Sequence, residues 1–170
     1  MDAAELRSLQ APLKARYREA PEAARIPARA EAVLDPANIA CNVTAGARSV
    51  VAGLHPAAGG DGSLACSADM LLAALAACAG VTLSAVATAM GIAMRGGRVI
   101  AEGAWDARGT LGVDRAAPVG LTEISLTFAL DTDAAPEALE RLLAATERYC
   151  VIFQTLRTPP HISIVAAPRN

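Results

Sequence analysis

The spacing of apolar and polar residues changes along the chain and predicts the order of its elements. Apolar residues recur every three or four positions over residues 4–20, which predicts an amphipathic helix. They are Leu6, Leu9, Leu13 and Tyr17. Pro21 and Pro27 bracket a connector after this helix. The first 27 residues therefore form a helical extension, followed by a domain that covers residues 28–170.

Three short strands are predicted at the start of that domain, separated by turn residues. Their predicted bounds are 28–34, 38–44 and 48–54. Asp35-Pro36 and Ala45-Gly46 supply the turns. Alternation within the second strand places Cys41 on the apolar face, so we expect this thiol to lie in the core.

A long apolar helix is predicted in the middle of the chain. Residues 55–63 are rich in Gly and Pro and predict a loop, and no Lys or Ser/Thr follows as in a phosphate-binding loop. The helix then runs from Ser67 as its N-cap to about Ala89 and ends at Gly91. It is apolar nearly all round, which predicts burial on most sides. Because a helix about 30 Å long cannot be hidden by a chain of this size alone, we expect a dimer.

The second half of the chain predicts strands, one helix and a last strand. The first two strands have predicted bounds of 98–109 and 119–131, and the second has a clean period of two. Asp133 and Pro136 open a helix whose apolar stripe ends at Cys150. Residues 161–165 predict a final strand. The mixture of strand and helix segments indicates an α+β fold.

Composition narrows the class of protein. The 170 residues suit one domain, and the net charge is −2 with basic residues scattered, so nucleic-acid binding is not indicated. Aromatic residues make up 3% of the chain, which leaves few rings for stacking on bases. The most apolar stretch, residues 70–94, contains hydroxyl side chains, and the acidic start is not a secretory signal. We expect a cytoplasmic protein without a membrane span.

Four cysteines are the candidate reactive groups: Cys41, Cys66, Cys78 and Cys150. No CxxC or CxxH pair is present, so a structural zinc site is not indicated. Cys66 precedes Cys78 by 12 residues, about 18 Å along a helix, which is beyond the reach of a disulfide. Cys66 lies near a helix start, where thiol pKa values can fall, but a core role is the simpler interpretation.

Cys78 and Cys150 can meet if their helices face each other. Cys78 is flanked by Ala77, Ala79 and Gly80, which leave room for a substrate or another backbone near the sulfur. The apolar face that carries Cys150 must pack on something, and the central helix offers the largest apolar surface. Two adjoining thiols suit peroxide reduction, because one attacks the peroxide and the other condenses with the sulfenic acid to form a disulfide. Both can equally be small core residues.

Two segments resemble motifs of the OsmC/Ohr family of thiol-dependent peroxide reductases. Residues 67–78, SADMLLAALAAC, resemble the family's central-helix motif, and residues 147–156, ERYCVIFQTL, resemble its second-cysteine motif. The similarity covers roughly residues 28–166. It implies an OsmC-like fold with antiparallel sheets packed around a long buried central helix, an intertwined homodimer, and active sites at the dimer interface.

The resemblance also implies a reaction. In this family the first cysteine attacks an organic hydroperoxide and the second resolves the sulfenic acid, and the matching positions in this chain are Cys78 and Cys150. No cofactor is implied beyond an external dithiol reductant, such as a lipoylated protein or thioredoxin. An alternative is a non-enzymatic dimer that binds a small apolar ligand at its interface, with structural thiols. A dimer without any pocket is a third interpretation.

The chain departs from the family pattern at three places. The family's arginine near the first hairpin has no clear counterpart, and Arg29 and Arg48 are the nearby candidates. Asp69 precedes Cys78 by nine residues, which places it about 180° round the helix from Cys78. We therefore expect Asp69 to cap the helix rather than face the sulfur. Val151 stands where many relatives have proline.

Overall fold

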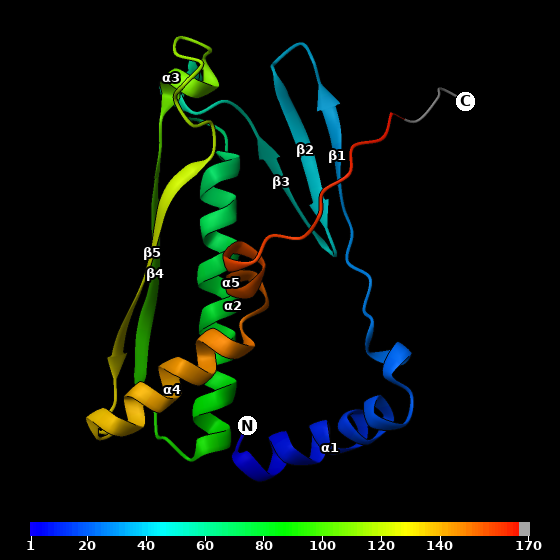
Figure 1. Ribbon diagram of the computed structural model, residues 1–170, viewed down its shortest axis with the longest axis vertical. Helices are drawn as coiled ribbons and strands as arrows, with labels where there is room; N and C mark the ends of the chain where they lie inside the picture. Colours follow the sequence, from blue (N-terminus) through cyan, green and yellow to red (C-terminus); the bar gives the residue numbers. More distant parts are fainter. Residues whose placement is uncertain (167–170) are drawn as a thin grey trace.

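The computed structural model describes residues 1–166 and has α+β architecture (Figure 1). The helices are α1 (Ala3–Glu19), α2 (Ser67–Met90), α3 (Ala107–Thr110), α4 (Pro136–Tyr149) and α5 (Val151–Arg157). The strands are β1 (Ala30–Asp35), β2 (Ala40–Ala45), β3 (Arg48–Ala52), β4 (Gly96–Trp105) and β5 (Leu121–Asp131). Two 3-10 turns, Pro21–Ala24 and Pro56–Ala58, lie in the expected connector and loop.

Both sheets are antiparallel, as the OsmC/Ohr resemblance implies. One sheet has the strand order β1-β2-β3, and the other is the β4-β5 pair. The β4-β5 pair runs alongside α2, while α4 crosses the C-terminal half of α2 and α5 lies against its middle (Figure 1). Helix α2 is therefore the element on which the second half of the chain is assembled.

The first sheet is joined to the rest of the chain just before α2. Ala65 donates its N–H to the carbonyl of Val51 at 3.2 Å and accepts the N–H of Gly53 at 3.0 Å. This sheet leaves large apolar side chains in solvent, including Val33, Leu34 and Ile39. It reaches away from α2 in Figure 1, with one face uncovered by the described chain.

The core is built where apolar stripes of two helices meet. On α2 the buried residues recur every fourth position, as one helical face requires: Leu75, Ala79, Leu83 and Ala87. On α4 the stripe repeats at the same interval: Leu142, Thr146 and Cys150. Phe128 and Leu130 of β5 close the cluster from the side. The alanines in the α2 stripe allow this close approach.

Helix α2 is less enclosed than its composition predicts. The single chain buries one stripe of α2 and leaves Val81 73% exposed, so it does not by itself provide the expected burial on most sides. Its N-cap is Cys66 rather than Ser67, and no side chain caps the helix. Its end is as predicted: Gly91 has a left-handed backbone (φ 69°) and donates its N–H to the last carbonyls.

Two strand predictions differ from the structure. The strand expected over 98–109 ends at Trp105, because Asp106 accepts the N–H of Arg108 at 2.9 Å and starts the short helix α3. Residues 161–165 form no strand, since no neighbouring strand of the described chain pairs with them. Asp133 pairs with Arg95 instead of capping α4, which begins at Pro136 as expected.

The core cluster predicts a large effect of one truncation. Leu142 is fully buried between α2 and β5, so Leu142→Ala should lower the free energy of unfolding by about 2–5 kcal/mol. Denaturant unfolding followed by circular dichroism measures this change. Leu9→Ala is the matched control, because Leu9 of α1 is 59% exposed and its loss should cost far less. Equal losses in both variants would contradict this core assignment.

Candidate functional site

A break between α4 and α5 forms the frame of the candidate site. Helix α4 ends as the N–H of Cys150 donates to the carbonyl of Thr146 at 2.9 Å. Cys150 then has extended backbone angles (φ −74°, ψ 109°) and serves as the N-cap position of α5. The first N–H groups of a helix have no partner within it. The break therefore presents unpaired backbone donors beside the Cys150 side chain.

Cys78 faces this break from the middle of α2. It lies one residue before Ala79 of the buried stripe and one turn before Thr82, on the side where α2 meets α5. The Cys78 side chain is half-buried, whereas Cys150 is only 1% exposed. The structure thus brings together the two thiols that the sequence singled out.

The environment favours the thiolate form of Cys78. Burial raises the pKa of Cys78, but hydrogen bonds from the Ile152 N–H, the Cys150 thiol, the Val151 N–H and the Thr82 hydroxyl outweigh burial. The pKa of Cys78 is therefore lower than that of an ordinary thiol. A thiol that is a thiolate at lower pH is the more reactive nucleophile near neutrality.

The environment of Cys150 has the opposite effect. Burial raises the pKa of Cys150, and the neighbouring Cys78 raises it further, because the Cys150 S–H donates to the Cys78 sulfur and like charges repel. The N–H groups of Phe153 and Ile152 lower it only in part. Of the two sulfurs, Cys78 is thus the one that loses its proton first.

Sequence reasoning missed the backbone donors and Thr82. No Gly or Pro marks a helix end at Cys150, so the apolar stripe gave no sign that α5 follows as a separate helix. Thr82 follows Cys78 by four residues, and the sequence pattern alone assigned no role to its hydroxyl. The available signal was that spacing of four residues, which puts a hydroxyl directly beside a thiol.

Other candidates lie away from the pair. Arg29 is exposed just before β1 and hydrogen-bonds Glu31 at 2.7 Å, and Arg48 starts β3 in the first sheet. Neither arginine is among the groups that shift the pKa of Cys78. Asp69 lies in the first turn of α2 but makes no capping hydrogen bond, so the predicted capping by its side chain is wrong.

The remaining thiols, Cys41 and Cys66, do not join the site. Cys41 in β2 is half-buried rather than enclosed in the core. Cys66 precedes α2 and lines a separate cavity with His55 and Trp105, whose rings meet edge to face with centroids 5.4 Å apart. Within residues 1–166, no three His, Cys, Asp or Glu side chains are grouped so as to hold a metal ion.

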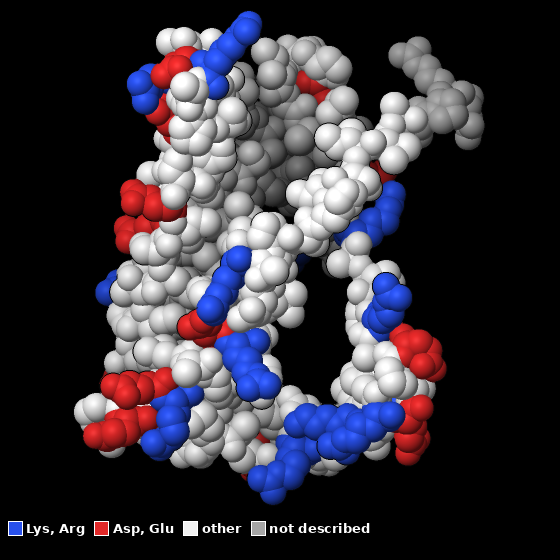
Figure 2. Space-filling model, viewed as in Figure 1, with Lys and Arg blue, Asp and Glu red and all other residues white. Residues whose placement is uncertain are grey.

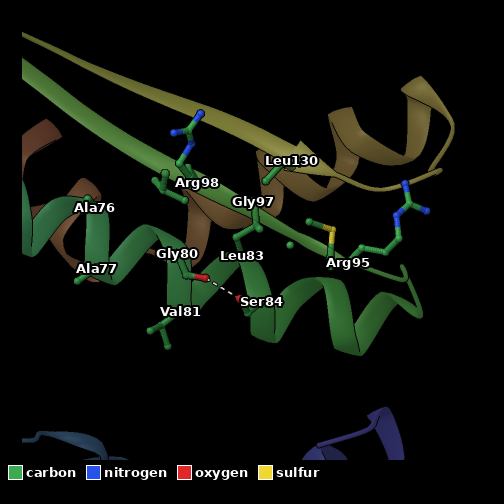
Figure 3. Close-up of a pocket in the computed structure, with 13 residues that line it drawn as sticks. Ala76, Ala77, Gly80, Val81, Leu83, Ser84, Arg95, Gly97, Arg98 and Leu130 are labelled. Atoms are coloured by element: carbon green, nitrogen blue, oxygen red, sulfur yellow. Dashed lines mark hydrogen bonds between the residues drawn. The ribbon is translucent and has the colours of Figure 1, made fainter.

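Two cavities flank α2 near the thiols. The larger, about 700 Å³, lies between α2 and β4 and is lined by small residues such as Ala76 and Gly80 (Figure 3). These residues lie on the side of α2 away from Cys78, so this cavity does not open onto its sulfur. The second, about 370 Å³, adjoins Cys150 and is lined mainly by apolar side chains, including Phe128, Leu143 and Phe153.

The fold and the site define an α+β protein with two adjoining thiols on packed helices, and comparison with known proteins gives its family. The sequence model of the OsmC-like protein family matches residues 60–165. The chain belongs to the OsmC-like protein family. Among curated proteins no relative matches the chain.

Solved structures show the same fold. An OsmC-like protein from Mycoplasma pneumoniae superposes with a TM-score of 0.67 at 17% identity, covering 79% of this chain and 89% of that one. An organic hydroperoxide resistance protein from Elizabethkingia anophelis superposes with a TM-score of 0.64 at 16% identity, covering 79% of this chain and 91% of that one. The organic hydroperoxide resistance protein OhrB of Bacillus subtilis superposes with a TM-score of 0.53 at 21% identity, covering 79% of this chain and 93% of that one.

The unequal environments predict a difference in reactivity. Iodoacetamide should alkylate Cys78 at lower pH than Cys150, because alkylation needs the thiolate and the pKa of Cys78 is the lowered one. Mass spectrometry of peptides from protein treated across a pH series measures both profiles. Cys150→Ala should move the Cys78 profile to higher pH because it removes a donor, while Cys41→Ala should leave it in place. A Cys150 profile at lower pH than that of Cys78 would contradict the assignment.

Proposed function

We propose that the protein is a two-cysteine peroxidase that reduces organic hydroperoxides to alcohols. The observation that carries the proposal is the packing of α2 against the α4–α5 break, which brings Cys78 beside the buried Cys150. The pKa of Cys78 is lowered and that of Cys150 is raised, which supports the two roles. One sulfur is prepared to attack, and a protonated partner lies beside it. Relatives of the same fold include proteins named for organic hydroperoxide resistance, which agrees with this chemistry.

The first step is attack by the Cys78 thiolate on the peroxide. Its sulfur forms a bond with the oxygen farther from the organic group, and the O–O bond breaks. Cys78 becomes a sulfenic acid, and the departing alkoxide takes a proton to leave as the alcohol. The donors around Cys78 serve this step by holding the sulfur as a thiolate near neutral pH.

The second step forms the disulfide. The Cys150 sulfur attacks the Cys78 sulfenic acid, the S–O bond breaks, and the oxygen leaves as water with the proton of Cys150. An external dithiol, such as a lipoylated protein or thioredoxin, then reduces the disulfide by thiol exchange. The protein needs no bound cofactor for this cycle, and a reducing cytoplasm would supply the dithiol.

The cavity beside Cys150 supports a second candidate function. Its volume of about 370 Å³ and its mainly apolar lining suit a small apolar ligand. In that case the chain binds the ligand without chemistry, and both thiols serve only as packing groups. The two candidates differ in whether a hydroperoxide consumes the thiols.

The proposed assembly is a homodimer in which a second copy covers the open face of α2. Figure 3 shows Val81 pointing away from β4 and β5. The uncovered face continues on the first sheet and on residues 161–165, where Ile162 and Ile164 are exposed. Monomeric proteins seldom leave apolar surface this extensive in water. Figure 2 also shows open space between α5 and the N-terminal connector, which an intertwined partner can enter.

The same α2 helix is long and apolar enough to cross a membrane, judged by length and composition alone. A second copy is the better occupant, because α2 already packs on β4, α4 and α5 and carries the thiol site on that side. Charge does not favour a nucleic-acid partner either. Basic side chains gather along α1, with acidic ones beside its end (Figure 2), but the whole chain carries a net charge of −2.

The enzymatic proposal predicts a defined loss of thiols. One equivalent of cumene hydroperoxide added to the reduced protein should consume two thiols per chain within minutes, because Cys78 is oxidised and Cys150 condenses with it. Titration of free thiols and peptide mass spectrometry measure the loss and the Cys78–Cys150 disulfide. An unchanged thiol titre would contradict the peroxidase and favour the ligand-binding alternative.

Two serine variants separate the roles in that experiment. Cys78→Ser should abolish thiol loss, while Cys150→Ser should stop the reaction at a Cys78 sulfenic acid that dimedone traps. Cys66→Ser is the matched control, and it should lose two thiols as the unmodified protein does.

The proposed dimer predicts that a charge on the open face of α2 disrupts assembly. Val81→Lys should convert a dimer to monomer or aggregate at micromolar concentration, because a lysine would be buried against the partner. Light scattering after size exclusion measures the mass. Val113→Lys is the control, because Val113 is also 73% exposed but lies in the loop after α3. A monomeric unmodified protein, or one soluble only in detergent, would contradict the dimer.

A further inference from the structure

The hydrogen bonding at the α4–α5 break is unusual at one carbonyl. In a continuous helix the carbonyl of Glu147 would accept the N–H of Val151, four residues later. In this chain the two helices are separated by the extended backbone of Cys150, and this bond is not made. The carbonyl of Glu147 instead accepts the side-chain Nε2 of Gln154 at 2.8 Å. A side chain has taken the place of a backbone donor.

This replacement has a direct consequence for the thiol site. The extended backbone of Cys150 separates the N–H groups of Val151 and Ile152 from the carbonyls of α4, and both N–H groups act as donors to Cys78. Gln154 donates to the carbonyl of Glu147, which would accept the N–H of Val151 in a continuous helix. If α4 and α5 fused into one helix, both N–H groups would turn back to the carbonyls of Glu147 and Arg148. The donors around Cys78 would then be reduced to the Cys150 thiol and the Thr82 hydroxyl.

A second contact joins the two sides of the break. Arg157, in the last turn of α5, forms an ion pair with the carboxylate of Glu147. Both side chains of this pair are largely in solvent, where ion pairs add little stability. Gln154 is half-buried and bonds a main-chain carbonyl, so its hydrogen bond holds the break more firmly.

We propose that Gln154 is a positioning residue that keeps α4 and α5 as separate helices, so that the N–H groups of Val151 and Ile152 face Cys78. This role rests on the proposed function of Cys78 as the attacking thiol. Gln154 does not touch the reacting sulfur or the peroxide. It acts through the backbone that it holds in place.

The test uses Gln154→Met, which keeps the length of the side chain and removes its donor. The iodoacetamide rate of Cys78 at pH 7 should fall about three- to tenfold, because its pH profile moves to higher pH. Thr155→Val is the matched control. It removes a hydroxyl that donates to the carbonyl of Val151 at 2.8 Å within α5, and it leaves Glu147 untouched. The control should keep the profile of the unmodified protein.

A second measurement separates positioning from a loss of folding. In 15N-labelled protein, the amide signals of Val151 and Ile152 should shift as Cys78 titrates, and Gln154→Met should abolish this response. If Gln154→Met does not fold, Gln154→Asn replaces it, since the shorter amide cannot span the break. An unchanged Cys78 profile in either folded variant overturns the proposal.

The alkylation profile is independent of peroxide chemistry, so the two proposals can fail separately. A protein that ignores hydroperoxide but shows the shifted profile in Gln154→Met loses the peroxidase assignment alone. An active peroxidase whose Cys78 profile is unaffected by Gln154→Met loses only the positioning role of Gln154.

Discussion

The site depends on the interruption of one helix at Cys150. A half-buried thiol in an apolar surrounding stays protonated, because burial penalises the charged form. At Cys78 this penalty is outweighed by hydrogen-bond donors, and two of them, the N–H groups of Val151 and Ile152, are available because α4 stops and α5 starts again. Burial, the backbone angles of Cys150 and the charge state of Cys78 are therefore linked, and a change in any one of them alters the others.

Helix α2 supplies the fixed side of this arrangement. Its buried stripe packs on α4 and places Cys78 at the edge of the core, where it contacts α5 without being fully enclosed. Alanine and glycine at neighbouring positions allow two other elements to lie against the helix. The same composition leaves its opposite face apolar and uncovered in the single chain. One sequence feature thus accounts for both the thiol site and the uncovered apolar face.

Periodicity predicted most of the elements but not the break. The period of two in β5, the apolar stripe of α4 and the glycine at the end of α2 are local signals, and each was confirmed. Two apolar faces that must be covered made a meeting of Cys78 and Cys150 possible, and the OsmC/Ohr resemblance implied the two thiols as a pair. Helix α5 was missed because Cys150-Val151-Ile152 continues the apolar pattern without a stop residue. Residues 161–165 have strand composition, yet a strand also needs a neighbour, which sequence pattern does not supply.

In the proposed cycle the pKa values of Cys78 and Cys150 change one after the other. While Cys78 is a thiolate, its charge and its hydrogen bond help to keep the proton on Cys150, so the two sulfurs do not compete for the peroxide. Conversion of Cys78 to a sulfenic acid removes that charge. One cause of the raised pKa of Cys150 is then lost, while the N–H groups of Phe153 and Ile152 remain. Cys150 becomes easier to deprotonate only after the first step, when its attack on Cys78 is required.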